Sequence, residues 1–159
     1  MKNNRVLSLQ AKCAKFPFGK KIFSHLVAGI APYFKTIKPY IVDVRPNYIK
    51  VSMSKRRKVH NHLKTVHAIA ICNLCEFAAG VCMEASIPAH RRWIPVGMQV
   101  AYLKKAETDL VGICDLGTPD WDNINHQICH VSVVDVNGVE VMTADINMRV
   151  SDRPVRVKT

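Results

Sequence analysis

The longest apolar pattern in the chain extends from Val66 to Met83. Apolar and small residues occupy almost the whole circumference of a helix drawn through it, which is typical of a helix surrounded by protein. Glu76 lies near the middle of this segment. Because burial of an unpaired carboxylate is costly, we expect Glu76 to be paired, hydrogen-bonded, neutral or open to a cleft. It is therefore the first candidate for a functional residue.

Shorter patterns on both sides of this segment predict an N-terminal helical region and a series of strands. Apolar residues with helical spacing over residues 16–34 predict one or two helices, closed by Pro32. Pro46-Asn47 separates the first two strands, and Asn137-Gly138 is a strong signal for a tight hairpin between the last two. Alternating or continuous apolar runs place the strands at residues 40–45, 48–54, 98–103, 109–116, 125–134 and 140–150.

This order of elements predicts an α+β fold in which a curved antiparallel sheet is wrapped around a long central helix. Residues 1–39 would form an N-terminal helical extension and residues 40–159 the main domain, with a second copy of the chain covering the rest of the helix. A membrane-spanning role for the apolar helix is disfavoured. Asn73 and Glu76 lie near its centre, and amphipathic strands flank it.

Charge is distributed unevenly along the 159 residues, whose formal net charge is +11. Residues 1–65 contain 15 Lys or Arg and one acidic residue, whereas residues 66–159 contain 8 and 11. A basic surface of this kind suits nucleic acid, an anionic membrane or the phosphates of coenzyme A. Specific nucleic-acid binding is disfavoured, because no zinc-finger spacing, phosphate-clamping loop or paired aromatic RNA-binding motif is present.

The cysteine and histidine patterns do not predict a metal site. Cys72 and Cys75 have helical spacing but no second pair, so they are interpreted as core thiols. His60, His62 and His67 are close in sequence but no carboxylate accompanies them. The six cysteines lie in apolar contexts and no secretory leader is recognised. We therefore expect a cytoplasmic protein with reduced thiols.

A combined motif of Asn61, His67, Glu76 and Gly80 resembles the hotdog-fold thioesterase superfamily. It is most similar to the phenylacetyl-CoA thioesterase-like group, whose motif places Gly-Gly after the histidine; here Ala68 follows it. The segments NHLKTVHAIAICNLCEFAAG and HRRWIPVGMQVAYLKKAETDL are similar to an uncharacterised thioesterase-like branch of that superfamily. The resemblance implies a hotdog fold with active sites at a dimer interface.

The spacing of His67 and Glu76 also predicts a dimer. On one helix, nine residues correspond to a rise of about 13–14 Å and a rotation of roughly 180°. The two side chains therefore cannot share a site within one chain. A two-fold symmetric homodimer, which could pair further into a tetramer, would bring the helix start of one subunit to the helix middle of the other.

The predicted reaction is hydrolysis of an acyl thioester of coenzyme A or of an acyl carrier protein. Glu76 would act as the general base for water, or as the nucleophile. The backbone amides of Ala68 and Ile69 would polarise the thioester carbonyl. No cofactor is expected apart from the coenzyme A portion of the substrate.

Other residues are candidates for binding the substrate. Asn61 and His67 would orient the thioester or the water, and Gly80 would leave space beside the carboxylate. Basic side chains could hold the phosphates of coenzyme A. The candidates are Arg56, Arg57, Arg91, Arg92, Lys104 and Lys105.

Each of these residues also has a structural interpretation. His67 could hydrogen-bond the loop that enters the helix, Asn61 could be a turn residue, and Glu76 could pair with a cation of the facing subunit.

Two further functions stay open. One is a binding module that holds an acyl-CoA or fatty acid without hydrolysing it. The other is a peripheral membrane protein that uses basic and apolar residues of the N-terminal region. The residues concerned are Lys20, Lys21, Lys35, Lys38, Phe16, Phe18, Ile22 and Phe23.

Overall fold

A computed structural model describes residues 4–154 of the chain. The N-terminal helices are α1 (Arg5–Cys13), α2 (Gly19–Ile30) and the 3-10 helix η1 (Pro32–Thr36). The remaining elements are β1 (Tyr40–Arg45), β2 (Tyr48–Met53), the 3-10 helix η2 (Arg57–Val59), α3 (Ala68–Ser86), β3 (Arg91–Tyr102), β4 (Leu110–Asp115), β5 (His126–Asp135) and β6 (Glu140–Asp152).

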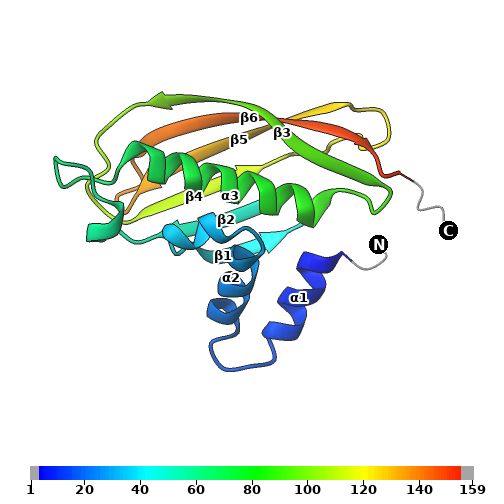
Figure 1. Ribbon diagram of the computed structural model, residues 1–159, viewed down its shortest axis with the longest axis horizontal. Helices are drawn as coiled ribbons and strands as arrows, with labels where there is room; N and C mark the ends of the chain where they lie inside the picture. The colour runs from blue at the N-terminus through cyan, green and yellow to red at the C-terminus, as the bar shows by residue number, and fades with distance from the viewer. Residues whose placement is uncertain (1–3, 155–159) are drawn as a thin grey trace.

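The strands form one antiparallel sheet in the order β1-β2-β4-β5-β6-β3. The sheet curves over α3, which lies along its concave face (Figure 1). Gly112 on β4 permits this close packing, since a Cβ atom there would lie 3.3 Å from Leu74 of α3. Leu74 and Ala78 are fully buried between helix and sheet. The predicted α+β architecture is therefore confirmed.

The three N-terminal helices form a layer against β1 and α3 (Figure 1). Asn4 caps α1 by accepting hydrogen bonds from two amides, and its Nδ2 donates to the Glu84 carbonyl at 2.6 Å. Phe34 of η1 packs edge-on against Phe77 of α3, with ring centroids 5.2 Å apart. These contacts fix the helical layer along α3. The sequence pattern predicted α2 but gave no separate signal for α1, which buries only Val6 and Cys13.

Strand β3 is longer than the sequence pattern predicted. It begins at Arg91 instead of residue 98, and it pairs with β6 along its length, from Arg91 opposite Asp152 to Tyr102 opposite Met142. No alternation of burial marks its centre, because residues 94–99 are exposed on both faces of the sheet. The half-buried pattern from which strands are predicted is therefore absent there. Strand β3 lies at one edge of the sheet, and its second side pairs with no other strand among residues 4–154.

Helix α3 is not enclosed on every side in the single chain, and the open face is the part that the sequence analysis assigned to a second copy of the chain. Ile69 is 55% exposed, Glu76 is exposed and Gly80 is half-buried. The helix is long and apolar enough to cross a membrane, yet 67% of its apolar window is buried within the protein. Its apolar character is thus explained mainly by the sheet, with one face left open.

Candidate active site

The open face of α3 forms one wall of a groove, which we call the Glu76 groove. Helices α1, α2 and η1 supply the opposite wall, and β3 closes one side. The volume is about 510 Å³. The lining is mostly apolar and comprises Arg5, Val6, Leu9, Val27, Ile30, Ala31, Phe34, Glu76, Phe77, Gly80, Val81, Glu84, Trp93 and Pro95. A concave apolar cavity with few polar groups is typical of a small-molecule site.

Glu76 itself fulfils one of the alternatives predicted from the sequence, because it opens to a cleft. None of the ion pairs within residues 4–154 involves it. Its neighbours along the groove wall are the apolar Phe77 and Gly80. A carboxylate in this position can accept a proton from a bound water molecule without first breaking an ion pair.

Gly80 does not leave the expected free space beside the carboxylate. A Cβ atom at Gly80 would lie 3.1 Å from the Trp93 ring, so the glycine permits Trp93 to pack on α3. The indole Nε1 of Trp93 donates to a carboxylate oxygen of Glu84 at 3.1 Å, which fixes the ring. Trp93 therefore forms part of the groove wall, a role that the sequence analysis did not identify.

At the start of α3, His67 is the N-cap residue. Its Nδ1 accepts a hydrogen bond from the Ile69 amide at 3.1 Å. The Ile69 amide is consequently occupied, which corrects the expectation that it polarises a thioester carbonyl. Ala68 precedes it as the first helical residue, where an N–H has no intrahelical acceptor. Its amide stays available.

Asn61 shapes the loop before α3. Its Oδ1 accepts hydrogen bonds from the amides of Leu63 and Thr65 at 2.9 and 3.1 Å, and its Nδ2 donates to the Thr65 hydroxyl at 2.8 Å. Three of its polar interactions are thus made within one loop. This arrangement matches the structural interpretation of Asn61 as a turn residue.

A second cavity, which we call the helix-start pocket, lies beside this loop and has a volume of about 490 Å³. It brings together Asn61, Ala68, Lys104 and Lys105, four of the residues selected from the sequence. The helix-start pocket shares no lining residue with the Glu76 groove. The structure therefore places Glu76 and Gly80 at one cavity and these four residues at another.

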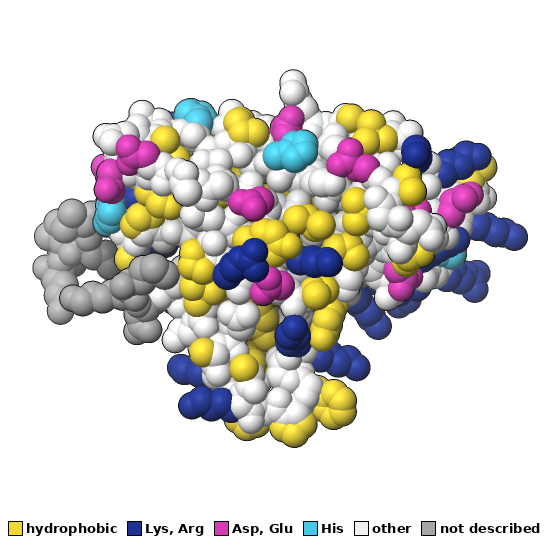
Figure 2. All heavy atoms as spheres, turned by 180° about the vertical axis from the view of Figure 1, so that it is seen from behind, with side chains coloured by type: hydrophobic (Ala, Val, Ile, Leu, Met, Phe, Trp, Pro, Cys, Tyr) yellow, Lys and Arg dark blue, Asp and Glu magenta, His cyan; other side chains and the backbone are white. Residues whose placement is uncertain are grey.

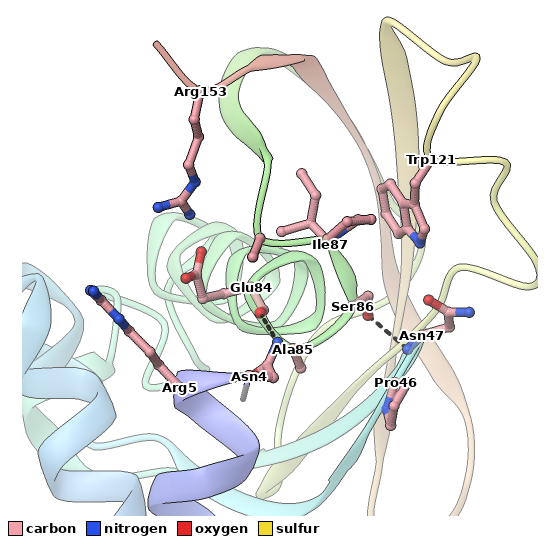
Figure 3. A pocket seen from close by; sticks show the side chains of 12 residues that line it. Asn4, Arg5, Pro46, Asn47, Glu84, Ala85, Ser86, Ile87, Trp121 and Arg153 are labelled. Atoms are coloured by element: carbon pink, nitrogen blue, oxygen red, sulfur yellow. Dashed lines mark hydrogen bonds between the residues drawn. The ribbon is translucent and has the colours of Figure 1, made fainter. Parts of the chain in front are cut away.

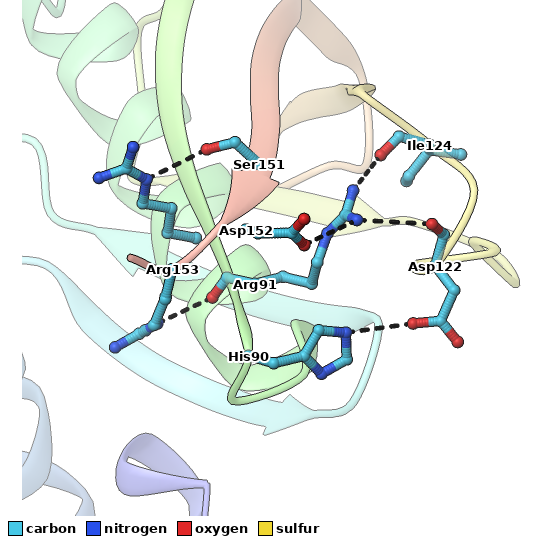
Figure 4. Close-up of polar contacts among 8 residues, drawn as sticks. His90, Arg91, Asp122, Ile124, Ser151, Asp152 and Arg153 are labelled. Atoms are coloured by element: carbon cyan, nitrogen blue, oxygen red, sulfur yellow. Dashed lines mark hydrogen bonds and ion pairs between the residues drawn. The ribbon is translucent and has the colours of Figure 1, made fainter. Parts of the chain in front are cut away.

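The arginine candidates differ in accessibility. Arg91 is only 7% exposed, and its guanidinium donates to the carbonyls of Asp122 and Ile124 and to the Asp152 carboxylate (Figure 4). Arg91 anchors the β4–β5 connection and is not free to bind a phosphate. The prediction that it holds a phosphate of coenzyme A is therefore wrong. Arg92 is exposed and donates from Nε to the Ser151 hydroxyl at 3.1 Å.

Arg56 and Arg57 lie at η2, away from both cavity linings. Arg56 is half-buried and donates to the Thr36 carbonyl, whereas Arg57 is exposed. Of the six basic candidates, Lys104 and Lys105 are the ones that line a described cavity.

A third cavity, of about 700 Å³, lies at the carboxyl end of α3 (Figure 3). The Ser86 hydroxyl accepts a hydrogen bond from the Asn47 amide and donates to the Cys82 carbonyl, and Asn4 caps α1. The Ser86 and Asn4 side chains therefore form hydrogen bonds with backbone groups. Arg153 and Trp121 also line this cavity.

The six cysteines are free and buried. Burial raises the pKa of the Cys75 thiol to about 12 and also raises the pKa of the Cys72 thiol. Such thiols are protonated and unreactive at neutral pH. Within residues 4–154, no group of three or more His, Cys, Asp or Glu side chains is arranged to hold a metal ion.

Known proteins similar to this chain fall into one structural group. The model of a domain of unknown function, DUF4442, matches residues 19–150. A structural-genomics protein, APC5556, is 40% identical with a TM-score of 0.82, and the match covers 93% of this chain and 98% of that one. No curated protein matches the chain.

More distant matches carry thioesterase names. A probable thioesterase of unknown function from Pseudomonas aeruginosa is 16% identical with a TM-score of 0.72, covering 87% of this chain and 97% of that chain. A thioesterase from Haemophilus influenzae is 8% identical with a TM-score of 0.68, covering 79% and 87%. These similarities confirm the predicted hotdog fold.

Proposed function

The chain belongs to the DUF4442 family and has the hotdog fold, and from this premise we propose that it is a thioester hydrolase. Its substrate would be an acyl thioester of coenzyme A or of an acyl carrier protein. The observation that carries the proposal is the exposed Glu76 carboxylate, free of any described ion pair, in the wall of an apolar groove of about 510 Å³.

In the proposed reaction Glu76 removes a proton from water as the water oxygen attacks the thioester carbonyl carbon. The carbonyl oxygen becomes an oxyanion, and the Ala68 amide donates a hydrogen bond to it. Collapse of this intermediate breaks the carbon–sulfur bond. The thiolate leaves with the proton held by Glu76, and a carboxylic acid is the second product.

This mechanism requires a homodimer, because Glu76 and Ala68 line separate cavities within one chain. The free edge of β3 offers a surface for pairing with a second copy. Its apolar side chains Ile94, Val96 and Met98 are 60%, 52% and 41% exposed. A long exposed edge strand of this kind is a template for strand pairing. Pairing of two β3 edges would place the open faces of the two α3 helices side by side.

The two cavities would then bind different parts of the substrate. The Glu76 groove, with its apolar lining, would take the acyl chain. Lys104 and Lys105 at the helix-start pocket of the other subunit would meet the phosphates of coenzyme A or of a carrier-protein arm.

The test measures thiol release from a panel of acyl-CoA substrates with a thiol-reactive dye. Glu76→Gln keeps the size of the side chain but removes the base, so we expect kcat to fall about 10²–10⁴-fold. Glu107→Gln is the matched control, since Glu107 is exposed and lies outside all three cavities. Unchanged turnover in Glu76→Gln would disprove the assignment of the base.

A second candidate function is an acyl-CoA binding module without hydrolysis. The observation that favours it is the hydrogen bond from the Ile69 amide to His67, which leaves one amide donor at the start of α3. Calorimetry separates the two functions. Binding of acyl-CoA without any thiol release by the wild-type dimer would establish the binding module.

A further inference from the structure

The turn between α1 and α2 forms the end of the molecule farthest from the sheet (Figure 1). Phe16 and Phe18 in this turn are 62% and 82% exposed. Lys12, Lys15 and Lys21 flank them and are also exposed. We call these five residues the helical tip. Figure 2 shows hydrophobic side chains at the foot of the molecule, with Lys and Arg side chains beside them.

The helical tip is held in a defined conformation. A Cβ atom at Gly19 would lie 2.1 Å from the Cys13 carbonyl oxygen, so the start of α2 is in direct contact with the end of α1. Phe18, which precedes it, adopts a left-handed backbone conformation with φ 60°, which is strained for an aromatic residue. The backbone strain at Phe18 thus keeps a large apolar side chain exposed to water. Strained backbone conformations of this kind are characteristic of functional surfaces.

An apolar stripe continues from the helical tip along α2. Ile22, Leu26 and Ile30 are spaced four residues apart, so they share one face of the helix, and they are 43%, 46% and 77% exposed. Ile30 also lines the Glu76 groove. The exposed stripe therefore connects the helical tip with the mouth of the groove.

The positive charge of the N-terminal region indicates what kind of partner the helical tip binds. Residues 4–38 contain seven Lys or Arg and no Asp or Glu. A second copy of the same surface would be repelled, whereas anionic lipid headgroups would be attracted. Phenylalanines that enter the acyl boundary, with lysines at headgroup level, are typical of an interfacial membrane contact. We propose that the helical tip docks this protein onto anionic membrane surfaces, with the α2 stripe facing the lipid.

Vesicle flotation of the full-length protein tests this proposal. We expect binding to vesicles of phosphatidylglycerol and phosphatidylcholine, weakened by salt, and little binding to pure phosphatidylcholine. Phe16→Ser with Phe18→Ser should reduce the affinity about tenfold or more. The control is Ile128→Ser with Val136→Ser, which removes side chains 52% and 66% exposed on the sheet side. It should bind as the wild type does.

Charge is tested in the same assay. Lys15→Gln with Lys21→Gln should weaken binding about 30-fold, since each lysine near an anionic surface contributes about a fivefold effect. The variant Lys58→Gln with Lys64→Gln has the same net charge as this tip variant, but its changes lie outside the helical tip. It should retain most of the binding. Equal losses in tip and control variants would overturn the proposal. It would also be overturned by tip-dependent binding of an acidic acyl carrier protein with no binding of vesicles.

Discussion

Replacement of Ala68 by proline tests the catalytic proposal at a single atom. Proline lacks an N–H, so Ala68→Pro removes the one amide donor that is available at the start of α3. The helix should persist, because proline is favoured at the first helical position. His67 before it has φ −65° and ψ 133°, the extended conformation that a residue preceding proline adopts.

The expected magnitude follows from the hydrogen bonds at this helix start. The Ile69 amide is bonded to His67 at 3.1 Å and cannot replace the lost donor. Loss of one oxyanion donor lowers kcat about 10²–10³-fold, or about 2.7–4 kcal/mol. Ala68→Ser is the control, because it changes the side chain but keeps the N–H. It should retain activity within about tenfold, and both variants should unfold at similar temperatures.

Mixing two inactive variants tests whether the site is shared between subunits. In a heterodimer of Glu76→Gln and Ala68→Pro, one of the two sites would contain both an intact Glu76 and an intact Ala68 amide. Random reassociation of equal amounts should therefore restore about a quarter of the wild-type activity. Full activity of Ala68→Pro would refute the oxyanion role, and a mixture that stays inactive would refute the shared site.

Three further predictions follow from other parts of the structure. Ala31 is an exposed residue of the Glu76 groove lining, so Ala31→Trp should fill part of the groove. It should lower kcat/KM for long-chain acyl-CoA about tenfold or more and leave acetyl-CoA turnover unchanged. An equal effect on both substrates would exclude the groove as the acyl site. Arg91→Ala should lower the free energy of unfolding by about 2–4 kcal/mol in urea titrations, because the carbonyls of Asp122 and Ile124 lose a buried donor, whereas Arg92→Ala should change it by about 0.5 kcal/mol or less. The six buried thiols should resist a thiol-reactive dye at pH 8 until the protein is denatured. Burial raises the pKa of the Cys75 thiol from 9.0 to about 12. The contribution of this thiol to the free energy of unfolding is therefore complete below pH 9 and declines as the pH rises toward 12. Rapid labelling of native protein would contradict this last prediction.

The sequence by itself determined the types of element and their order. Hydrophobic periodicity reflects which face of each segment is buried, so it located α2, α3, the first hairpin and the last strands. It also singled out Glu76, because a carboxylate inside an apolar helix is unusual wherever the helix packs. These signals are local, and they persist whatever the tertiary arrangement.

The tertiary structure alone decided which candidate residues are accessible. Arg91 looked like a surface cation, but pairing with β6 buries it beneath the β4–β5 connection. The space expected at Gly80 is occupied by Trp93, thirteen residues later in the chain, and the Ile69 amide is taken by His67. These facts depend on strand register and on side chains brought together from separate elements. Periodicity carries no information about them, because it describes one segment at a time.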